Sequence, residues 1–330
     1  MNLAIVGCGA IGRKRAQHLG NIRLVHCIDM DMPRAEHLAS LLKHGCRAGS
    51  DWRELLDRTD IDAVIIATPQ DSQVEIARGA IAAGIHVLVE KPAARHLDEL
   101  RDLPALAAKH NVRVRVGFNH RYHRAFQQAR HLVDSGVLGP LLFVRARYGH
   151  GGRLGYEGEW RAQPLRSGGG ELIDQGVHLI DLARWFLGEF VEVTGFAHTY
   201  FWDMPVEDNA FMLLKTATRQ AAFMHVSCTE WKNIFSWELY GRDGKLHVEG
   251  LGGSYGVERL SWYKNLPNMG PPETTIWEYP MEDNSWGIEM AEFLEDIRCA
   301  REPSAGLNDA IAALAVVGKL YRESGYDHRT

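Results

Sequence analysis

The chain has 330 residues, which is enough for two domains with separate hydrophobic cores. Hydrophobic residues make up 45% and charged residues 24%, proportions that exclude intrinsically disordered and low-complexity classes. The 37 Lys and Arg stand against 42 Asp and Glu, so the net charge of -5 argues against a nucleic-acid-binding protein held by phosphate contacts.

The cysteines and the apolar runs indicate the compartment. Five cysteines stand far apart without CxxC spacing, which is typical of reduced thiols in the cytosol and predicts no disulfide framework and no metal site. The first residues, MNLAIVG, lack a basic region, and the longest apolar run without glycine, 310–317, has eight residues. We therefore expect a cytoplasmic protein that neither enters nor crosses a membrane.

The first part of the chain alternates short apolar runs with helical patterns. A strand at 2–6 leads through a glycine-rich turn into a helix that ends near Leu19, and the next apolar run, 22–28, ends in Asp29. Further strands are expected at 63–67, 86–89 and 112–118, with helices at 73–83 and 97–109. This alternation predicts an α/β fold with a doubly wound parallel sheet.

The pattern changes after a helical segment at 121–135. Successive strands are expected at 141–148, 191–202, 210–216, 221–228, 235–240 and 245–248, followed by helices at 289–300 and 307–324. The sequence thus predicts a dinucleotide-binding domain over 1–118 and an α/β domain with a large, mostly antiparallel open sheet over 119–330.

Tryptophans are concentrated in this second part, where seven of the nine follow Gly170. So much aromatic surface favours a sheet face that another subunit covers, and we expect a homodimer or homotetramer formed through the C-terminal sheet. The alternative is that these side chains fill the core or line a pocket.

A glycine-rich turn points to a dinucleotide. Gly7, Gly9 and Gly12 have GxGxxG spacing between a strand and a helix, where a tight turn and a close backbone approach bind pyrophosphate. Asp29 follows the second strand, where a carboxylate accepts hydrogen bonds from ribose hydroxyls and repels a 2′-phosphate. We therefore expect NAD, while Arg34 and the basic run 13–15 leave NADP possible.

Two further segments carry candidate catalytic groups. Lys91, in Glu90-Lys91-Pro92, follows a strand at the carboxyl edge of the expected sheet. Asp174, His178 and Asp181 recur at i, i+4 and i+7, which places them along one face of a single helix. The alternative interpretation is a buried His–Asp pair with a structural role, and for Asp181 a structural role is favoured.

These motifs together resemble the Gfo/Idh/MocA oxidoreductases. The resemblance rests on GxGxxG at 7–12, EKP at 90–92, the junction VGFNHR at 116–121 and GGGxxxDxxxH at 168–178, all in the expected order. It implies a Rossmann domain, a sheet domain that forms dimers or tetramers, and a nicotinamide-dependent reaction at a secondary hydroxyl of a sugar or cyclitol. It also implies a catalytic set of Lys91, Asp174 and His178, with a cis bond before Pro92.

The resemblance extends to the cofactor site, with one departure. The segment 67–73 is similar to the family's TPxxxH pattern, but Gln73 stands where histidine is usual. Glutamine still donates and accepts hydrogen bonds. The expected cofactor-binding residues are Gly7, Gly9, Ala10, Ile11, Gly12, Asp29, Thr68, Pro69, Gln73, Glu90 and Lys91.

A glycine-rich segment at 148–166 is expected to form a loop over the substrate. Aromatic faces stack on sugar rings and arginines hold hydroxyls or phosphates, so its three arginines favour an anionic sugar, such as a sugar nucleotide or sugar acid. The alternative is a solvated linker. The expected substrate-binding residues are Lys91, Asn119, Arg121, Tyr148, Arg153, Trp160, Arg161, Asp174 and His178.

Oxidation of a secondary alcohol needs a base near the hydroxyl and a positive group that stabilises alkoxide character. His178 and Lys91 provide such a pair, and the sequence leaves open which of them takes the proton. Two alternatives within the same fold are an NAD-dependent glycoside hydrolase and a non-catalytic regulator that senses sugar or NAD.

Overall fold

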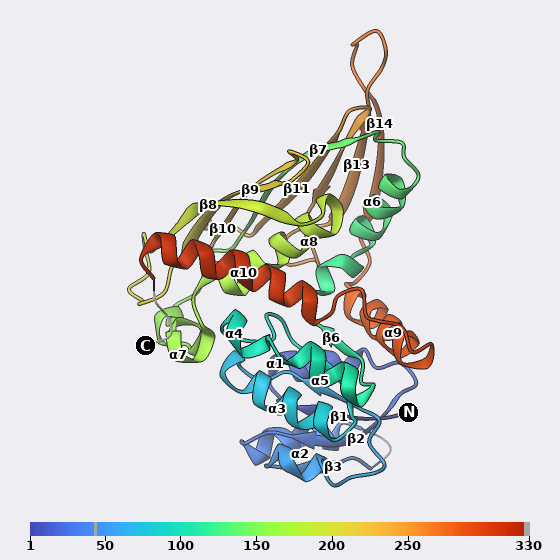
Figure 1. Cartoon of the computed structure of the whole chain (residues 1–330), viewed down its shortest axis with the longest axis vertical. Coiled ribbons are helices and arrows are strands. Elements are labelled where there is room, and N and C mark those ends of the chain that lie inside the picture. The colour runs from blue at the N-terminus through green and yellow to red at the C-terminus, as the bar shows by residue number, and fades with distance from the viewer. Residues whose placement is uncertain (43–44, 327–330) are drawn as a thin grey trace. The chain divides into compact units, whose positions relative to one another are not determined.

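A computed structural model describes residues 1–42 and 45–326 of the chain (Figure 1). The chain forms two compact units, one made of Met1–Phe118 with Trp286–Leu314 and the other of Asn119–Ser285 with Ala315–Thr330. The first crossing, after Phe118, coincides with the expected boundary. Residues 286–314, which the sequence analysis placed in the second domain, lie instead in the first unit.

A six-stranded sheet forms the centre of the first unit. All of its strand pairs are parallel, in the order β3-β2-β1-β4-β5-β6. Most of its residues are buried and β-branched or aliphatic, as expected of a sheet covered on both faces. The strands are β1 (Asn2–Val6), β2 (Arg23–Ile28), β3 (Arg47–Gly49), β4 (Ala63–Ile66), β5 (His86–Val89) and β6 (Val114–Val116).

Helices connect these strands. The segment 97–109, expected as one helix, is two helices, because Asp102 precedes a new first turn that contains Pro104, a residue favoured where a helix begins. The helices are α1 (Ala10–Gln17), α2 (Met32–Ser40), α3 (Gln70–Ala82), α4 (Leu97–Leu100) and α5 (Leu103–His110), with a 3₁₀ turn at Trp52–Leu55.

Helix α9 (Ser285–Arg298) explains why residues 286–314 belong to the first unit. Its Met290 and Phe293 are buried in one core with β1 and β2. Its carboxylates also pair with buried arginines of this unit, Glu289 with Arg15 and Asp296 with Arg115. Helical periodicity predicts an apolar face but not the sheet that it covers, so the sequence assigned α9 to the wrong domain.

An eight-stranded sheet forms the centre of the second unit (Figure 1), in the order β14-β13-β12-β11-β7-β10-β9-β8. Only the β7–β10 pair is parallel, which confirms the expected mostly antiparallel sheet. The strands are β7 (Leu141–Gly149), β8 (Phe190–His198), β9 (Asn209–Thr216), β10 (Ala221–Ser227), β11 (Ile234–Gly241), β12 (Gly244–Glu249), β13 (Glu258–Lys264) and β14 (Glu273–Tyr279).

Helices α6 and α8 pack on this sheet, α6 against β12, β13 and β14 and α8 against β7. A π-helical turn at Leu172–Gly176 directly precedes α8. The remaining elements are 3₁₀ turns at Asn119–Tyr122, Tyr156–Gly158 and Trp160–Ala162, and the helices α6 (Arg124–Asp134), α7 (Pro164–Ser167), α8 (Val177–Leu187) and α10 (Leu307–Ser324).

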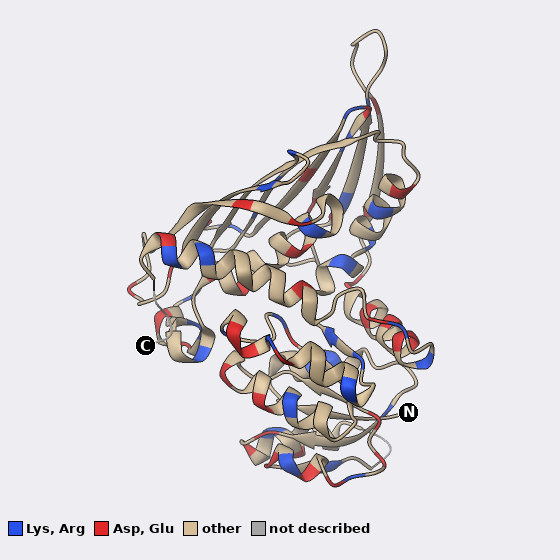
Figure 2. Cartoon of the chain, viewed as in Figure 1, with Lys and Arg blue, Asp and Glu red and all other residues tan. Residues whose placement is uncertain are grey.

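Charge and hydropathy add two observations. Figure 2 shows Lys and Arg interspersed with Asp and Glu along the helices and strands that face the viewer. Within the described residues, no helix combines the length and the apolar character needed to cross a bilayer.

Candidate active site

The glycine loop of the first unit has the geometry that a pyrophosphate needs. Gly7 has a φ of 95°, and a Cβ on it would lie 2.6 Å from the carbonyl of Ala67. A Cβ on Gly12 would lie 1.9 Å from the Gly7 oxygen, so the first turn of α1 packs directly on the loop. Gly9 has open space on its side-chain side. The loop therefore packs against the residues that follow β4, and the open position at Gly9 permits the close approach that a pyrophosphate needs.

Asp29 lies at the end of β2 and braces this loop. One carboxylate oxygen accepts the backbone N–H of Cys8 at 2.8 Å, and the other accepts that of Asp31 at 3.0 Å. The half-buried carboxylate thus stays at the carboxyl edge of the sheet.

Two of the four basic residues that left NADP open, Arg15 and Arg34, are bound to carboxylates. The Nε of Arg15 donates to Glu90 at 2.7 Å and its Nη1 donates to Glu289 at 2.5 Å, and the guanidinium is 2% exposed. Arg15 is thereby excluded as a phosphate ligand. Arg34 is exposed and pairs with Asp31 at 2.9 Å.

The segment with the departure from the family pattern forms the start of α3. Thr68 and Pro69 precede that helix, and Pro69 is its N-cap. Gln73 is buried, and its Nε2 donates to the Thr68 carbonyl at 3.1 Å. Its Oε1 has no hydrogen-bond partner among the described residues. The Gln73 side chain therefore stabilises the turn at Thr68 through this hydrogen bond.

The EKP segment follows β5. The Lys91–Pro92 peptide bond is cis, as the resemblance implied, and the turn closes through a hydrogen bond from Ala93 N to the Glu90 carbonyl at 2.9 Å. Glu90 is buried and bound to Arg15, whereas Lys91 is partly exposed. Glu90 thus holds the segment in place, and Lys91 remains partly accessible to solvent.

The helix of the second unit differs from the expected continuous α-helix. Asp174 lies in the π-turn and His178 in the first turn of α8, so the two are separated by a change of helical pitch. A π-turn inserts an extra residue and redirects the side chains beside it, and such turns are frequent at functional sites. The three residues therefore do not lie on one continuous α-helix as expected: only His178 and Asp181 lie on α8, three residues apart, which places them on the same side of that helix.

Each of the three side chains has its own partner. Asp174 accepts from Arg161 Nε at 3.1 Å. Asp181 accepts from Arg121 through both Nε and Nη2, at 2.7 and 2.5 Å, in a fully buried pair. The Arg121 guanidinium thereby holds the 119–122 turn to α8.

His178 is 4% exposed and stacks on the ring of His120, with centroids 3.7 Å apart and planes inclined by 14°. His120 in turn contacts Tyr148 at 5.3 Å and Phe235 at 6.0 Å between centroids. The sequence analysis noted His120 only as part of a motif. Its stacking with a residue 58 positions later has no local signal.

The loop over 148–166 contributes further groups. Burial raises the pKa of the Tyr148 phenol. Arg161 also lies over the ring of Trp160, 4.5 Å from its centroid. Arg153 pairs with Glu159 at 2.6 Å. Asn119 lies outside this segment, and its side-chain amide donates to the Ser285 hydroxyl at 3.0 Å.

Glu171 is a buried acid that the sequence analysis missed. One of its oxygens accepts the Tyr156 hydroxyl at 2.9 Å and lies 3.2 Å from His150 Nε2. Burial lowers the pKa of His150, but the hydrogen bond to Glu171 and the charges of Glu171 and Asp174 together raise it above its usual value. In the sequence, Glu171 could have been recognised as a site residue because it follows three glycines and precedes Asp174 by three positions.

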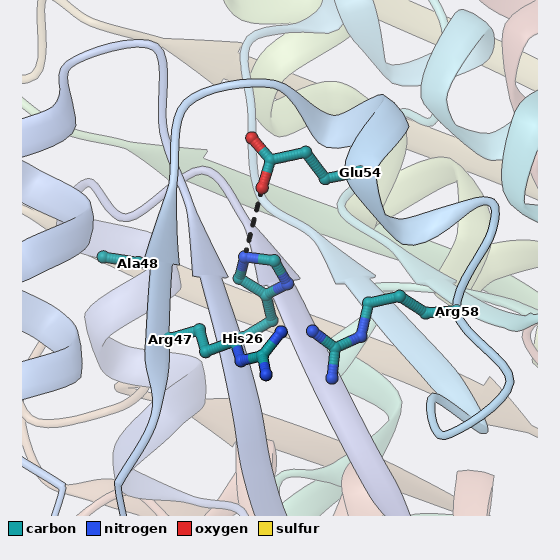
Figure 3. A pocket seen from close by; sticks show the side chains of 5 residues that line it. All are labelled: His26, Arg47, Ala48, Glu54 and Arg58. Carbon is teal, nitrogen blue, oxygen red and sulfur yellow. Dashed lines mark ion pairs between the residues drawn. The ribbon is translucent and has the colours of Figure 1, made fainter.

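A separate pocket of about 370 Å³ opens beside β2 and β3 (Figure 3). Its lining carries two arginines and one glutamate: Arg58 pairs with Asp60, outside the lining, at 2.6 Å, and Glu54 lies 3.6 Å from the ring of His26. None of the expected catalytic residues lines it. The lining residues are His26, Arg47, Ala48, Glu54 and Arg58.

Comparisons with known proteins identify relatives of this chain. Levoglucosan dehydrogenase of Pseudarthrobacter phenanthrenivorans is 34% identical over 169 residues, 51% of this chain and 43% of that protein, so the match spans less than half of that relative. Inositol 2-dehydrogenase of Rhizobium meliloti is 26% identical over 337 residues, 98% of this chain and 96% of that protein.

The fold is shared with a solved structure of levoglucosan dehydrogenase in complex with NADH, which has a TM-score of 0.86 at 22% identity and covers 98% of both chains. Residues 1–118 match the family described as "Oxidoreductase family, NAD-binding Rossmann fold", and residues 126–247 match the "GFO/IDH/MocA C-terminal domain". The chain therefore belongs to the Gfo/Idh/MocA family of NAD-binding oxidoreductases.

Proposed function

We propose that this protein transfers hydride between NAD and a secondary hydroxyl of a sugar or cyclitol, with Lys91, Asp174 and His178 as its catalytic residues. The observation that carries the proposal is the buried His178 imidazole, which the π-turn and the His120 ring position next to a helix turn that bears the Asp174 carboxylate. A base fixed in this way is what proton removal from an alcohol requires.

The described residues fit NAD. A Cβ would obstruct the loop at Gly7 and Gly12, whereas Gly9 has open space on its side-chain side, which permits the close backbone approach that a pyrophosphate needs. The Asp29 carboxylate has the position and the charge to accept bonds from ribose hydroxyls. Bound NAD supplies an acceptor for hydride at its nicotinamide ring.

The protein's own groups then handle the proton and the charge. The Lys91 ammonium donates a charge-assisted hydrogen bond to the substrate oxygen and stabilises its developing negative charge. The His178 imidazole receives the hydroxyl proton, or assists Lys91 in doing so. Asp174, which accepts a hydrogen bond from Arg161, orients the substrate.

The ion pairs of the substrate loop favour a neutral substrate over the anionic one that its arginines suggested. Of its three arginines, Arg153 and Arg161 are compensated by Glu159 and Asp174. An anion would have to displace a carboxylate from each of these two. We infer that the substrate is an uncharged sugar or cyclitol, the chemistry named by the levoglucosan and inositol dehydrogenases among the relatives.

The substrate class is tested by a panel of cyclitols, anhydrosugars, free sugars, sugar acids and sugar nucleotides, with NADH formation followed by its absorbance. We expect turnover with a neutral member. Turnover confined to sugar nucleotides or sugar acids would contradict the inference. Release of an aglycone without net NADH would instead support the glycoside hydrolase, and binding without either reaction would support the regulator.

Replacing Asp29 with asparagine should weaken NADH binding by about ten- to a hundred-fold, because hydrogen bonds to a charged group contribute roughly 1.5–3 kcal/mol. The difference in affinity between NADH and NADPH should become smaller, because the variant lacks the charge that repels a 2′-phosphate. Fluorescence titration with both nucleotides measures this. Glu36→Ala, an exposed acid of α2, is the control, and equal affinities in D29N and the unaltered protein would refute the role of Asp29.

A second copy of the chain is the proposed partner for the open face of the eight-stranded sheet. Four apolar side chains on neighbouring strands, 39–52% exposed, lie on this face: Phe143, Phe196, Leu213 and Phe223. We infer a homodimer or homotetramer, and Phe223→Lys should lower the mass measured by light scattering. The five free thiols further support a cytoplasmic location.

A further inference from the structure

Two thiols of the first unit lie close together at the edge of its sheet. The sulfurs of Cys27 and Cys46 are 3.4 Å apart, and that contact is an S–H···S hydrogen bond. Cys27 is completely buried, whereas Cys46 is partly exposed. Neither residue contributes to the reaction described above, and the sequence predicted only reduced thiols that stand far apart along the chain.

The sheet register explains the contact. Cys27 of β2 pairs with Ala48 of β3 in parallel register. Cys46 lies two residues before Ala48, and side chains two residues apart in extended chain point to the same face. Both thiols therefore lie on one face of the β2–β3 pair.

Geometry permits these sulfurs to bond. A disulfide needs an S–S distance of about 2.05 Å, so the sulfurs must approach by about 1.3 Å. β3 has three residues and pairs only with β2, at the edge of the sheet. A shift of this size in a short edge strand breaks few hydrogen bonds.

The two thiols have complementary chemistry. The hydrogen bond from Cys27 lowers the pKa of Cys46, which makes the partly exposed sulfur the thiolate former. The contact with Cys46, a further contact with Cys8 and burial raise the pKa of Cys27. A thiolate that an oxidant can reach, beside a second thiol, is the arrangement of an oxidisable pair.

We propose that Cys27 and Cys46 are a modification site at which a peroxide forms a reversible disulfide, and that this disulfide weakens NAD binding. The Cys46 thiolate attacks the peroxide, which breaks its O–O bond, gives Cys46 sulfenic acid and releases hydroxide that is protonated to water. The Cys27 sulfur then attacks the Cys46 sulfur, displaces its hydroxyl as water and loses its own proton. In total, two thiols are oxidised and one hydrogen peroxide is reduced to two waters.

The effect on the cofactor follows from the residues next to the pair. Ile28, adjacent to Cys27, accepts hydrogen bonds at its carbonyl from Gly7 N at 2.8 Å and from the Cys8 thiol at 3.4 Å. Asp29 N donates to the Gly49 carbonyl at 3.2 Å, which joins the ends of β2 and β3. Drawing the two strands together thus moves the groups that hold the glycine loop and Asp29.

The experiment compares the reduced protein with protein treated with hydrogen peroxide. Titratable thiols in denaturant should fall from five to three, and digestion should yield a peptide that links Cys27 to Cys46. NADH fluorescence titration should show at least a three-fold rise in Kd, and dithiothreitol should reverse both changes. Cys46→Ser should prevent both, whereas Cys299→Ser, which removes an exposed thiol, should lose one thiol from the count and still form the link.

Three outcomes would overturn the proposal. These are a thiol count that stays at five, a link that joins Cys8 or another chain in place of Cys46, and a Kd for NADH that is unchanged although the Cys27–Cys46 link has formed. The thiol count and peptide map use the unaltered chain, so the result does not depend on how well the serine variants fold.

Discussion

His178→Ala should lower kcat by about 10²- to 10⁴-fold, the usual contribution of a general acid–base group. The affinity for NADH should stay within two-fold, because the glycine loop and Asp29 belong to the other unit. Steady-state kinetics with a substrate from the panel, combined with fluorescence titration of NADH, measures both quantities.

His178→Asn extends this test, because asparagine keeps hydrogen-bonding capacity beside the His120 ring but cannot take a proton near neutral pH. It should be nearly as slow as the alanine variant. His131→Ala, which removes an exposed imidazole of α6, should leave kcat unchanged. A kcat for both His178 variants within three-fold of the unaltered protein would remove His178 from the catalytic set.

Arg15→Met should give the largest loss of stability among single substitutions in the first unit. Its guanidinium compensates Glu90 and Glu289, which are both buried, and lies 4.3 Å from the ring centroid of Trp286. Removing one partner of a buried ion pair costs about 3–5 kcal/mol, because the remaining charge stays desolvated. Urea unfolding followed by tryptophan fluorescence measures the loss.

The pH dependence of this loss provides a second measurement. Burial raises the pKa of Glu289 and Arg15 opposes that rise, so the R15M variant raises it further. An acid whose folded pKa lies above its unfolded value stabilises the protein at low pH and loses that contribution as the pH rises. The loss in the free energy of unfolding that R15M causes should therefore be smaller at pH 5 than at pH 8.

Two further variants sharpen the interpretation. Arg15→Met combined with Glu289→Gln should recover part of the stability at pH 8, because the amide carries no charge. Arg298→Met removes the exposed pair with Glu295 and should change the unfolding midpoint little. A deficit for R15M as small as that for R298M would contradict the buried network.

The sequence predicted the fold wherever local patterns determine it. Apolar runs located most strands of the first unit, and glycine spacing located the cofactor loop. β13 and β14 were missed because ERLSWYK and ETTIWEY mix charged, polar and aromatic residues without the apolar runs that mark strands elsewhere in the chain. β3 was missed because three residues carry no recognisable period.

The candidate site shows the same division. The residues of the motifs were found, since each motif is a short stretch of chain. The pairings among them were not predicted, because Arg121 with Asp181, and His120 with His178, are brought together by tertiary packing across 60 and 58 positions. The π-turn also escaped the sequence, because residue spacing is compatible with either pitch.

Residues 286–314 belong to the first unit although they come late in the chain, and this limits how the two units can be exchanged between proteins. A chimaera that exchanges cofactor domains between relatives must transplant two separate stretches, 1–118 and 286–314, from the same parent. A graft of the first stretch alone would separate Arg15 from Glu289 and Arg115 from Asp296. The cofactor-binding unit of this protein is thus built from two stretches of the chain that must be exchanged together.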